Sequence, residues 1–173
     1  MGTRVFPDVY PNDAIISSVG KLISKSGETE VGLANRKQVK NAIRRAERIL
    51  PGTPAPDGEV DPRWQAIIHI GYFVETQPEE VWTFVQRWGK HPNPDLQAAI
   101  ATCLLEDLLE YHFDLIFPRV EREVRASKRF RDTLKRCWKL GQAKKPHNAA
   151  KIDRLLREQG GLKNPSSHSP ANL

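Results

Sequence analysis

The most distinctive chemical pattern in this chain is a run of cations near its C-terminal end. A stripe at steps of three, four and four residues consists of Lys128, Arg131, Lys135 and Lys139. On a helix that spacing places all four side chains on one face. The full set assigned to this basic surface is Arg119, Arg122, Arg125, Lys128, Arg129, Arg131, Lys135, Arg136 and Lys139. Such arrays bind phosphate backbones by releasing counterions, without reading sequence. The alternative is an ordinary solvated helix face.

A second pattern is acidic and lies in the middle of the chain. The carboxylates assigned to a candidate partner-binding face are Glu106, Asp107, Glu110 and Asp114. Glu106 and Glu110 are one helical turn apart, and His112 follows near the expected helix end. Carboxylates and an imidazole at this spacing could bind a metal or transfer protons. We favour a solvated acidic face that docks a basic partner, because no second ligand-rich segment completes a metal site.

The sequence carries none of the short patterns that identify common catalytic or cofactor sites. Walker A, zinc-finger, RNA-recognition and Gly-x-Ser-x-Gly patterns are all missing. Two cysteines, Cys103 and Cys137, take the position that Gly71 holds in a related segment. We interpret all three as small residues required where helices approach closely. We therefore assign no catalytic residue, no metal ligand and no cofactor.

An internal repeat predicts the helices that position these residues. Three similar segments begin at residues 61, 93 and 127, which are 32 and 34 residues apart. Each begins with a residue typical of a helix N-cap: Asp61, Asn93 and Ser127. Proline follows in the first two, as favoured at the first helical position. A period in this range is typical of stacked helical hairpins that bury their apolar faces against one another.

Apolar spacing predicts helices along most of the chain. The expected helices cover residues 32–50, 62–74, 78–89, 93–111, 113–126, 128–141 and 148–158, with Pro118 either kinking the fifth or marking its start. No stretch alternates with a period of two, so we expect no strand. The expected core includes His69 and the tryptophans Trp64, Trp82, Trp88 and Trp138. We divide the chain into an N-terminal extension (1–30) with a short helix, a repeat domain (31–158) and a disordered tail (159–173).

The charge of the chain is strongly segregated. The net charge of +6 divides into +2 over residues 1–60, −6 over residues 61–117 and +10 over residues 118–173. In a stacked fold this becomes an acidic middle and a basic C-terminal end, which bears on partners and not on the fold. No apolar run approaches the ~20 residues that span a bilayer. We therefore expect a cytoplasmic protein that does not enter membranes.

The order of these helices resembles HEAT-like repeats over roughly residues 33–141. The residues that carry the resemblance are the first-helix segment 78–85, the internal proline Pro118 and the second-helix segment 93–99. The family often has an arginine where this chain has Gln65 and Gln97. The resemblance implies an all-α fold, a short right-handed α-solenoid of about three HEAT-like antiparallel helix pairs. It also implies a binding scaffold for proteins or nucleic acids, which is an inference by analogy.

The favoured function is a non-catalytic binding module that engages nucleic acid phosphates or an acidic protein through its basic C-terminal surface. One alternative is a DNA base-excision enzyme, because HEAT-like repeats also form a family of alkylpurine glycosylases. No catalytic residue of that family can be matched to this chain. Another alternative is a protein–protein adaptor that uses the acidic middle repeat. The sequence does not define the partner or the oligomeric state.

Overall fold

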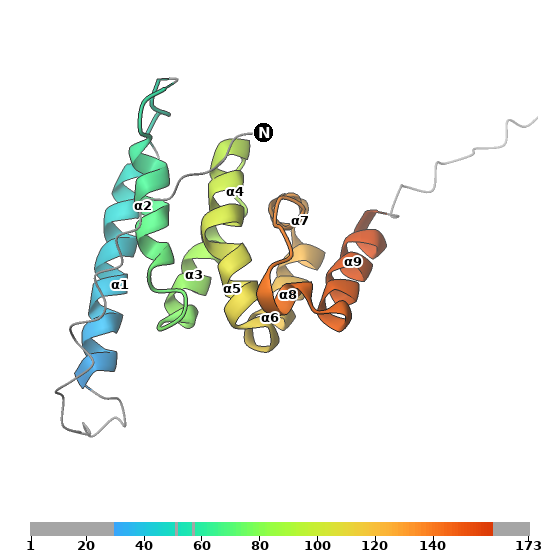
Figure 1. The fold of residues 1–173 in the computed structure, drawn as a ribbon. Coiled ribbons are helices and arrows are strands. Elements are labelled where there is room, and N and C mark those ends of the chain that lie inside the picture. Colours follow the sequence, from blue (N-terminus) through green and yellow to red (C-terminus); the bar gives the residue numbers. More distant parts are fainter. Residues whose placement is uncertain (1–29, 51, 57, 161–173) are drawn as a thin grey trace, which may run out of the picture.

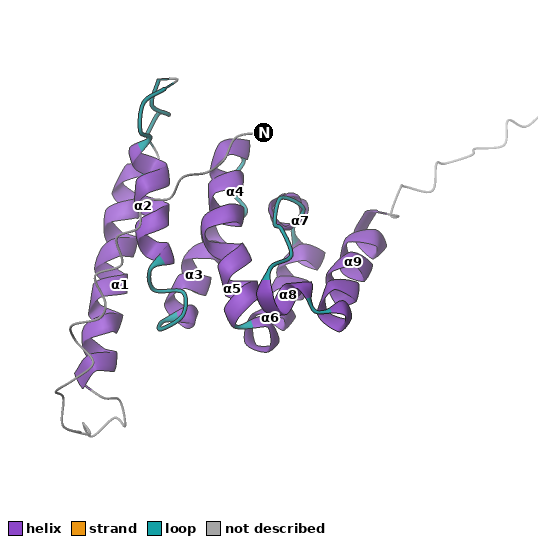
Figure 2. Cartoon of the chain, viewed as in Figure 1, coloured by secondary structure: helices purple, strands orange, loops and turns teal. Residues whose placement is uncertain are grey.

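The computed structural model describes residues 30–50, 52–56 and 58–160 of the chain. Within these ranges the chain forms helices joined by loops, without a strand, so the fold is all-α as expected (Figure 2). The predicted short helix near residues 14–22 lies outside the described residues. So does the predicted tail from residue 161 onward. No helix in the described part is both long and apolar enough to cross a membrane.

The helices follow one another from α1 at one end of the molecule to α9 at the other (Figure 1). Their bounds are α1 (Glu30–Ile49), α2 (Pro62–Gly71), α3 (Pro78–Trp88), α4 (Pro94–Ile100), the π-helix η1 (Ala101–Leu105), α5 (Glu106–Tyr111), α6 (Phe113–Ala126), α7 (Lys128–Leu134), α8 (Gly141–Lys144) and α9 (Pro146–Gly160). The main contacts join neighbours along the chain: α1 packs on α2 and α3, α5 on α6 and α8, and α6 on α7 and α9. A continuous apolar core runs through this row.

The three predicted N-caps each begin a helix. The carboxylate of Asp61 and the amide oxygen of Asn93 each accept a hydrogen bond at 2.8 Å from the backbone N–H two residues on. The hydroxyl of Ser127 accepts one at 3.3 Å from the N–H three residues on. Proline occupies the first turn of α2 and α4. Such a cap contributes about 1 kcal/mol, so the sequence-predicted starts of α2, α4 and α7 have a direct physical cause.

A wide turn in the middle of the fourth predicted helix was not expected. The segments α4, η1 and α5 form one continuous helix whose central part, Ala101–Leu105, is a π-helix. In a regular α-helix Leu105 would point away from Leu96, because nine residues make two and a half turns. The π-turn accommodates an extra residue. Both leucines are thereby buried in the same core, at 1% and 0% exposure.

Close approaches to η1 explain the small residues at the repeat positions. A Cβ atom added to Gly71 would lie 3.0 Å from the carbonyl oxygen of Cys103. The thiol of Cys137 contacts the carbonyl oxygen of Ala101 at 3.7 Å. The two cysteines are not joined by a disulfide, and burial raises the pKa of Cys137 well above its usual range. The prediction that these positions require small residues is confirmed for Gly71.

The predicted helix over residues 128–141 is shorter than expected. It ends at Leu134, and the backbone N–H groups of Arg136 and Cys137 bond three residues back before the chain leaves the helix. Trp138 therefore lies in a loop and is 75% exposed, which corrects the prediction that it packs in the core. The other tryptophans are buried or partly buried. The four cations predicted to form one stripe on this helix are therefore not all on it, because Lys139 lies outside the helix.

Three further predictions concern His69, Pro118 and the last helix. His69 is exposed on α2 and lies 3.2 Å from the guanidinium of Arg45, so the prediction of a core histidine is wrong. Pro118 lies inside the continuous helix α6. The last predicted helix is longer, since α9 begins at Pro146 and is preceded by the short helix α8.

Candidate functional site

The predicted basic surface is partly paired within the protein. Arg119 donates to Glu79 of α3 at 2.7 Å, and this contact lowers the pKa of Glu79. Arg125 pairs with Glu121 at 2.8 Å and with Glu158 of α9 at 3.2 Å. The acceptors lie on α3 (Glu79), on α9 (Glu158) and one turn earlier on α6 itself (Glu121). Part of the positive charge counted in the sequence therefore stabilises helix packing.

The predicted helical stripe shows the same behaviour. Lys135 pairs with Asp132 at 3.3 Å, and Lys139 pairs with Asp153 of α9 at 2.5 Å. Arg131 is only partly exposed and has an interaction of its own. Within the predicted basic surface, the exposed cations without an ion pair to a described residue are Arg122, Lys128, Arg129 and Arg136. These four come from α6, α7 and the turn that follows, so they do not form one row.

A more regular row of cations lies on α1. Along this 20-residue helix, Lys37, Lys40, Arg44 and Arg48 follow at steps of three, four and four residues. We call these four residues the α1 stripe. All four are exposed, and none forms an ion pair with a residue that the structure describes. The opposite face of α1 is in the core, where Val39, Ala42 and Ala46 are at most 3% exposed.

The flanks of α1 explain why the stripe remains uncovered. On one flank Arg36 pairs with Glu80 at 2.6 Å, and Glu47 pairs with Arg87 at 2.6 Å, both residues of α3. On the other flank Arg45 contacts His69 of α2. These contacts hold α1 against two neighbours. The main contacts of α1 with other described helices are with α2 and α3, and α1 is the first described helix of the row (Figure 1).

The predicted acidic face is brought together in part. Glu106, Asp107 and Glu110 lie on α5. Glu75, from the loop after α2, is close enough to repel the carboxylate of Asp107. Burial raises the pKa of Asp107 to about 6, and repulsion from Glu110, Glu106 and Glu75 contributes further. Glu75 was missed because it lies outside the repeat segments. Asp114 belongs instead to the first turn of α6.

The histidine of that pattern does not join the carboxylates. The Nε2 atom of His112 contacts the carbonyl oxygen of Val74 at 3.1 Å. This contact links the end of α5 to the turn after α2. Among the described residues no group of three or more His, Cys, Asp or Glu side chains is arranged to hold a metal ion. The arrangement supports electrostatic binding of a cationic partner and shows no proton-transfer geometry.

A buried arginine links two repeats, and this feature was missed in the sequence. Arg63 is 1% exposed, and its guanidinium donates to Asp61 at 2.6 Å and to Asp95 at 2.7 Å. The indole N–H of Trp64 donates to the second oxygen of Asp95 at 3.1 Å. The hydrogen bond from Arg63 is the main cause that lowers the pKa of Asp61 to about 2. Arg63 and Asp95 occupy equivalent positions in adjacent repeats. Their opposite charges were the signal in the sequence that could have predicted this ion pair.

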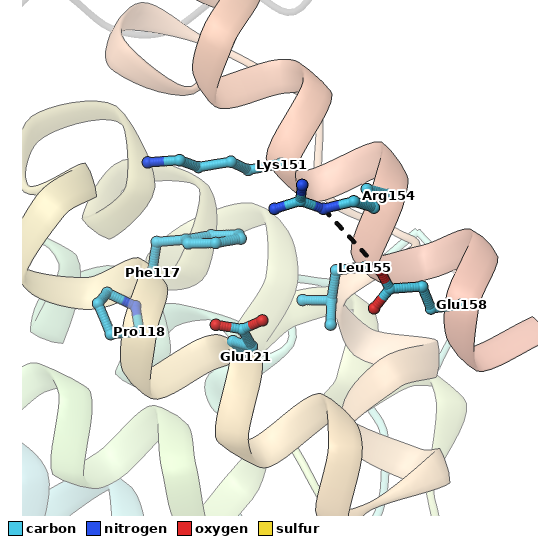
Figure 3. A pocket seen from close by; sticks show the side chains of 7 residues that line it. All are labelled: Phe117, Pro118, Glu121, Lys151, Arg154, Leu155 and Glu158. Atoms are coloured by element: carbon cyan, nitrogen blue, oxygen red, sulfur yellow. Dashed lines mark ion pairs between the residues drawn. The ribbon is translucent and has the colours of Figure 1, made fainter.

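The described part also contains a small hollow between α6 and α9. Its volume is about 220 Å³, and Phe117 lies at its base while Lys151 and Arg154 reach across from α9 (Figure 3). The remaining lining residues are Pro118, Glu121, Leu155 and Glu158. Arg154 is 3.9 Å from Glu158. Because two cations and two carboxylates line the hollow, it has no net preference for an ion of either sign.

Comparison with known proteins identifies a family. The sequence model of a family of unknown function, DUF6869, matches residues 53–158. The chain belongs to this family. No curated protein and no solved structure is similar to it. The match begins after α1, so it covers the acidic face and the Arg63 pair but not the α1 stripe.

Proposed function

We propose that this member of the DUF6869 family is a non-catalytic binding module of the cytoplasm that engages the phosphate backbone of nucleic acid. Its scaffold is a short right-handed α-solenoid of HEAT-like helix pairs, with pairs near α1–α2, α3–α5 and α6–α7. The arrangement of neighbours along the chain and the three matched N-caps support this architecture. The rigid row of helices fixes the position of the cations that bind the partner.

The observation that carries the proposal is the α1 stripe. Four exposed cations form no ion pair with a described residue and follow one another along a single face of one helix, whereas several cations of α6 and α7, such as Arg119 and Arg125, are paired to carboxylates. The row extends over ~17 Å, because each residue of a helix rises 1.5 Å. One strand of duplex nucleic acid presents a phosphate about every 3.4 Å along its axis. The stripe can therefore contact several phosphates of one backbone at the same time.

The expected binding is electrostatic and does not read sequence. A contact of four cations with four phosphates gives a slope of log K against log salt of about −3 to −4 for duplex DNA. The affinity then falls steeply between low and physiological salt. Base-edge readout would require side chains that enter a groove, and the stripe offers only long flexible cations.

No specific observation favours base excision. The tryptophan and aspartate that lie together are Trp64 and Asp95, and both oxygens of that aspartate already accept hydrogen bonds. These hydrogen bonds connect two repeats, so the pair has a structural role. The proposal therefore remains with binding alone.

Fluorescence anisotropy with a labelled DNA duplex and a labelled RNA hairpin tests the proposal. The wild-type protein is expected to bind both at low salt, and Lys40→Gln/Arg44→Gln should weaken binding about tenfold. Lys128→Gln/Arg129→Gln is the matched control, since it removes the same charge from exposed residues outside the stripe. Absence of nucleic acid binding at low salt would overturn the proposal. So would the finding that α1 binds an acidic protein and no nucleic acid.

A further inference from the structure

An exposed tryptophan stands beside the acidic residues of α5. Trp138 is 75% exposed, and Leu140 and Tyr111 are 41% and 44% exposed. Large aromatic side chains are usually buried in a fold with this much core, and exposed ones often mark interaction sites. None of the intramolecular contacts found for the described residues uses the indole ring of Trp138. This side chain is therefore available to a partner.

The loop that carries Trp138 is fixed from its N-terminal side. The backbone N–H of Trp138 donates to the carboxylate of Glu106 at 2.9 Å. Glu106 is only 7% exposed, so the acceptor is itself held in the fold. The next residue, Lys139, pairs with Asp153 of α9. The exposed position of Trp138 is consequently set by contacts of its own backbone and of its neighbour.

The same loop is fixed from its C-terminal side. Gly141 has a φ of +41°, and a Cβ atom there would lie 2.5 Å from Cγ of Glu110. The amide of Gln142 donates to the carbonyl oxygen of Tyr111 at 2.6 Å. Residues 137–142 therefore lie directly on α5. An exposed aromatic residue on a backbone that is already held loses little backbone entropy on binding, which favours a role as a binding hot spot.

Three carboxylates in this region form no ion pair within the described part of the chain. Asp107, Glu110 and Glu75 form no ion pair with a residue in the described ranges. Elsewhere in the described part many carboxylates are paired, including Glu79, Glu123 and Asp153. Unneutralised carboxylates that repel one another gain from an added cation. The complementary ligand is therefore cationic.

We propose that Trp138, together with Asp107 and Glu110, docks an arginine-containing basic segment of another protein. A guanidinium group can stack on the indole face, and the adjacent carboxylates accept its N–H groups. Arginine fits better than lysine because its planar group can do both at once. This surface lies within the family-matched segment and is separate from the α1 stripe. It attracts cations and repels phosphates, so it does not depend on the proposed nucleic acid binding.

Titration of a short fluorescein-labelled peptide of alternating arginine and glycine into the full chain tests this surface. We expect saturable binding that Trp138→Ala weakens about tenfold and that Trp138→Phe largely preserves. Asp107→Asn/Glu110→Gln should weaken it to a similar extent. The matched control is Glu59→Gln/Asp114→Asn, which removes the same charge from exposed carboxylates outside this surface and should leave binding unchanged.

Three outcomes would overturn the inference. They are the absence of saturable binding, binding that Trp138→Ala leaves intact, and an equal loss in the control variant. Sedimentation velocity of the protein alone adds a fourth, because self-association that disappears in Trp138→Ala would identify a second copy as the partner. Substitutions in the α1 stripe should not alter peptide binding, so failure here is distinguishable from failure of nucleic acid binding.

Discussion

Two basic regions of this protein have similar sequence patterns and different structural surroundings. The stripe at Lys128–Lys139 and the α1 stripe both place cations at steps of three, four and four residues. In the first, Lys135 and Lys139 pair with carboxylates and the helix ends before Lys139. In the second, the helix is continuous and all four cations are exposed without an ion pair to a described residue.

The difference follows from the place of each helix in the row. Helices α6 and α7 have neighbours on several sides, so their long cationic side chains reach carboxylates on α3, α9 and within α7. Among the described helices, α1 has its main contacts with α2 and α3, and the four cations of its outer face are exposed. A count of charges along the chain therefore includes C-terminal cations that are paired to carboxylates in the fold. Pairing, which depends on tertiary contacts, decides which cations remain available.

The largest effect is expected at Arg63, the most deeply buried paired cation. Arg63→Ala leaves Asp61 and Asp95 without their cation and should lower the free energy of unfolding by about 3–5 kcal/mol. Urea denaturation followed by circular dichroism measures this change. The triple variant Asp61→Asn/Arg63→Met/Asp95→Asn should be less destabilised, because no unpaired charge remains near the core. If both variants lose equal stability, packing and not charge pairing is the role of Arg63.

The next effect concerns Asp107, a carboxylate without a cation. Its pKa of about 6 in the folded state lies above the ordinary value of 3.8, so the folded state holds the proton more tightly. The charged form therefore destabilises the fold, and this penalty grows as pH rises from about 4 to 6. Asp107→Asn removes the penalty and should raise the free energy of unfolding by about 1–2 kcal/mol at pH 7, after allowance for partial solvent screening.

Denaturation of both proteins at pH 7 and below pH 4 measures this effect. The difference between them should vanish at the lower pH, where Asp107 is protonated in both the folded and unfolded states. A difference that is the same at both pH values would contradict the assigned cause. It would indicate a packing effect of the asparagine.

A small effect is expected for the surface pair of Arg119 and Glu79. The carboxylate of Glu79 is more than half exposed, so solvent screens the pair. Arg119→Gln should lower stability by about 0.5 kcal/mol and leave nucleic acid affinity nearly unchanged. A double-mutant cycle with Glu79→Gln isolates the interaction. A large loss of affinity with Arg119→Gln would return the binding site to the C-terminal region.

Much of the fold could be predicted from local sequence signals. The N-caps at Asp61, Asn93 and Ser127 depend on side chains within three residues, so they are visible in the sequence. The small residues Gly71 and Cys103 were recognised from their equivalent repeat positions. The π-turn at η1 was not predicted, because a wide turn responds to the core around it and has no local capping signal.

The candidate sites were harder to predict because they depend on contacts between distant residues. The acidic residues of α5 were identified from their helical spacing, but Glu75 joins them only through the tertiary fold. The exposure of Trp138 depends on where α7 ends and on the hydrogen bond to Glu106, 32 residues earlier. The basic pattern on α1 is visible in the sequence. The sequence does not show that these cations form no ion pair with the described residues.

The measurement that tests the central claim most directly is the salt dependence of duplex DNA binding for three proteins. They are the wild type, Lys37→Gln/Lys40→Gln/Arg44→Gln/Arg48→Gln, and the charge-matched Arg122→Gln/Lys128→Gln/Arg129→Gln/Arg136→Gln. The account predicts that loss of the α1 stripe makes the slope of log K against log salt shallower by about 3–4, and that the matched variant changes it by less than about 1. An equal change in both variants, or a larger one in the second, would contradict the claim that the α1 stripe contacts the phosphates.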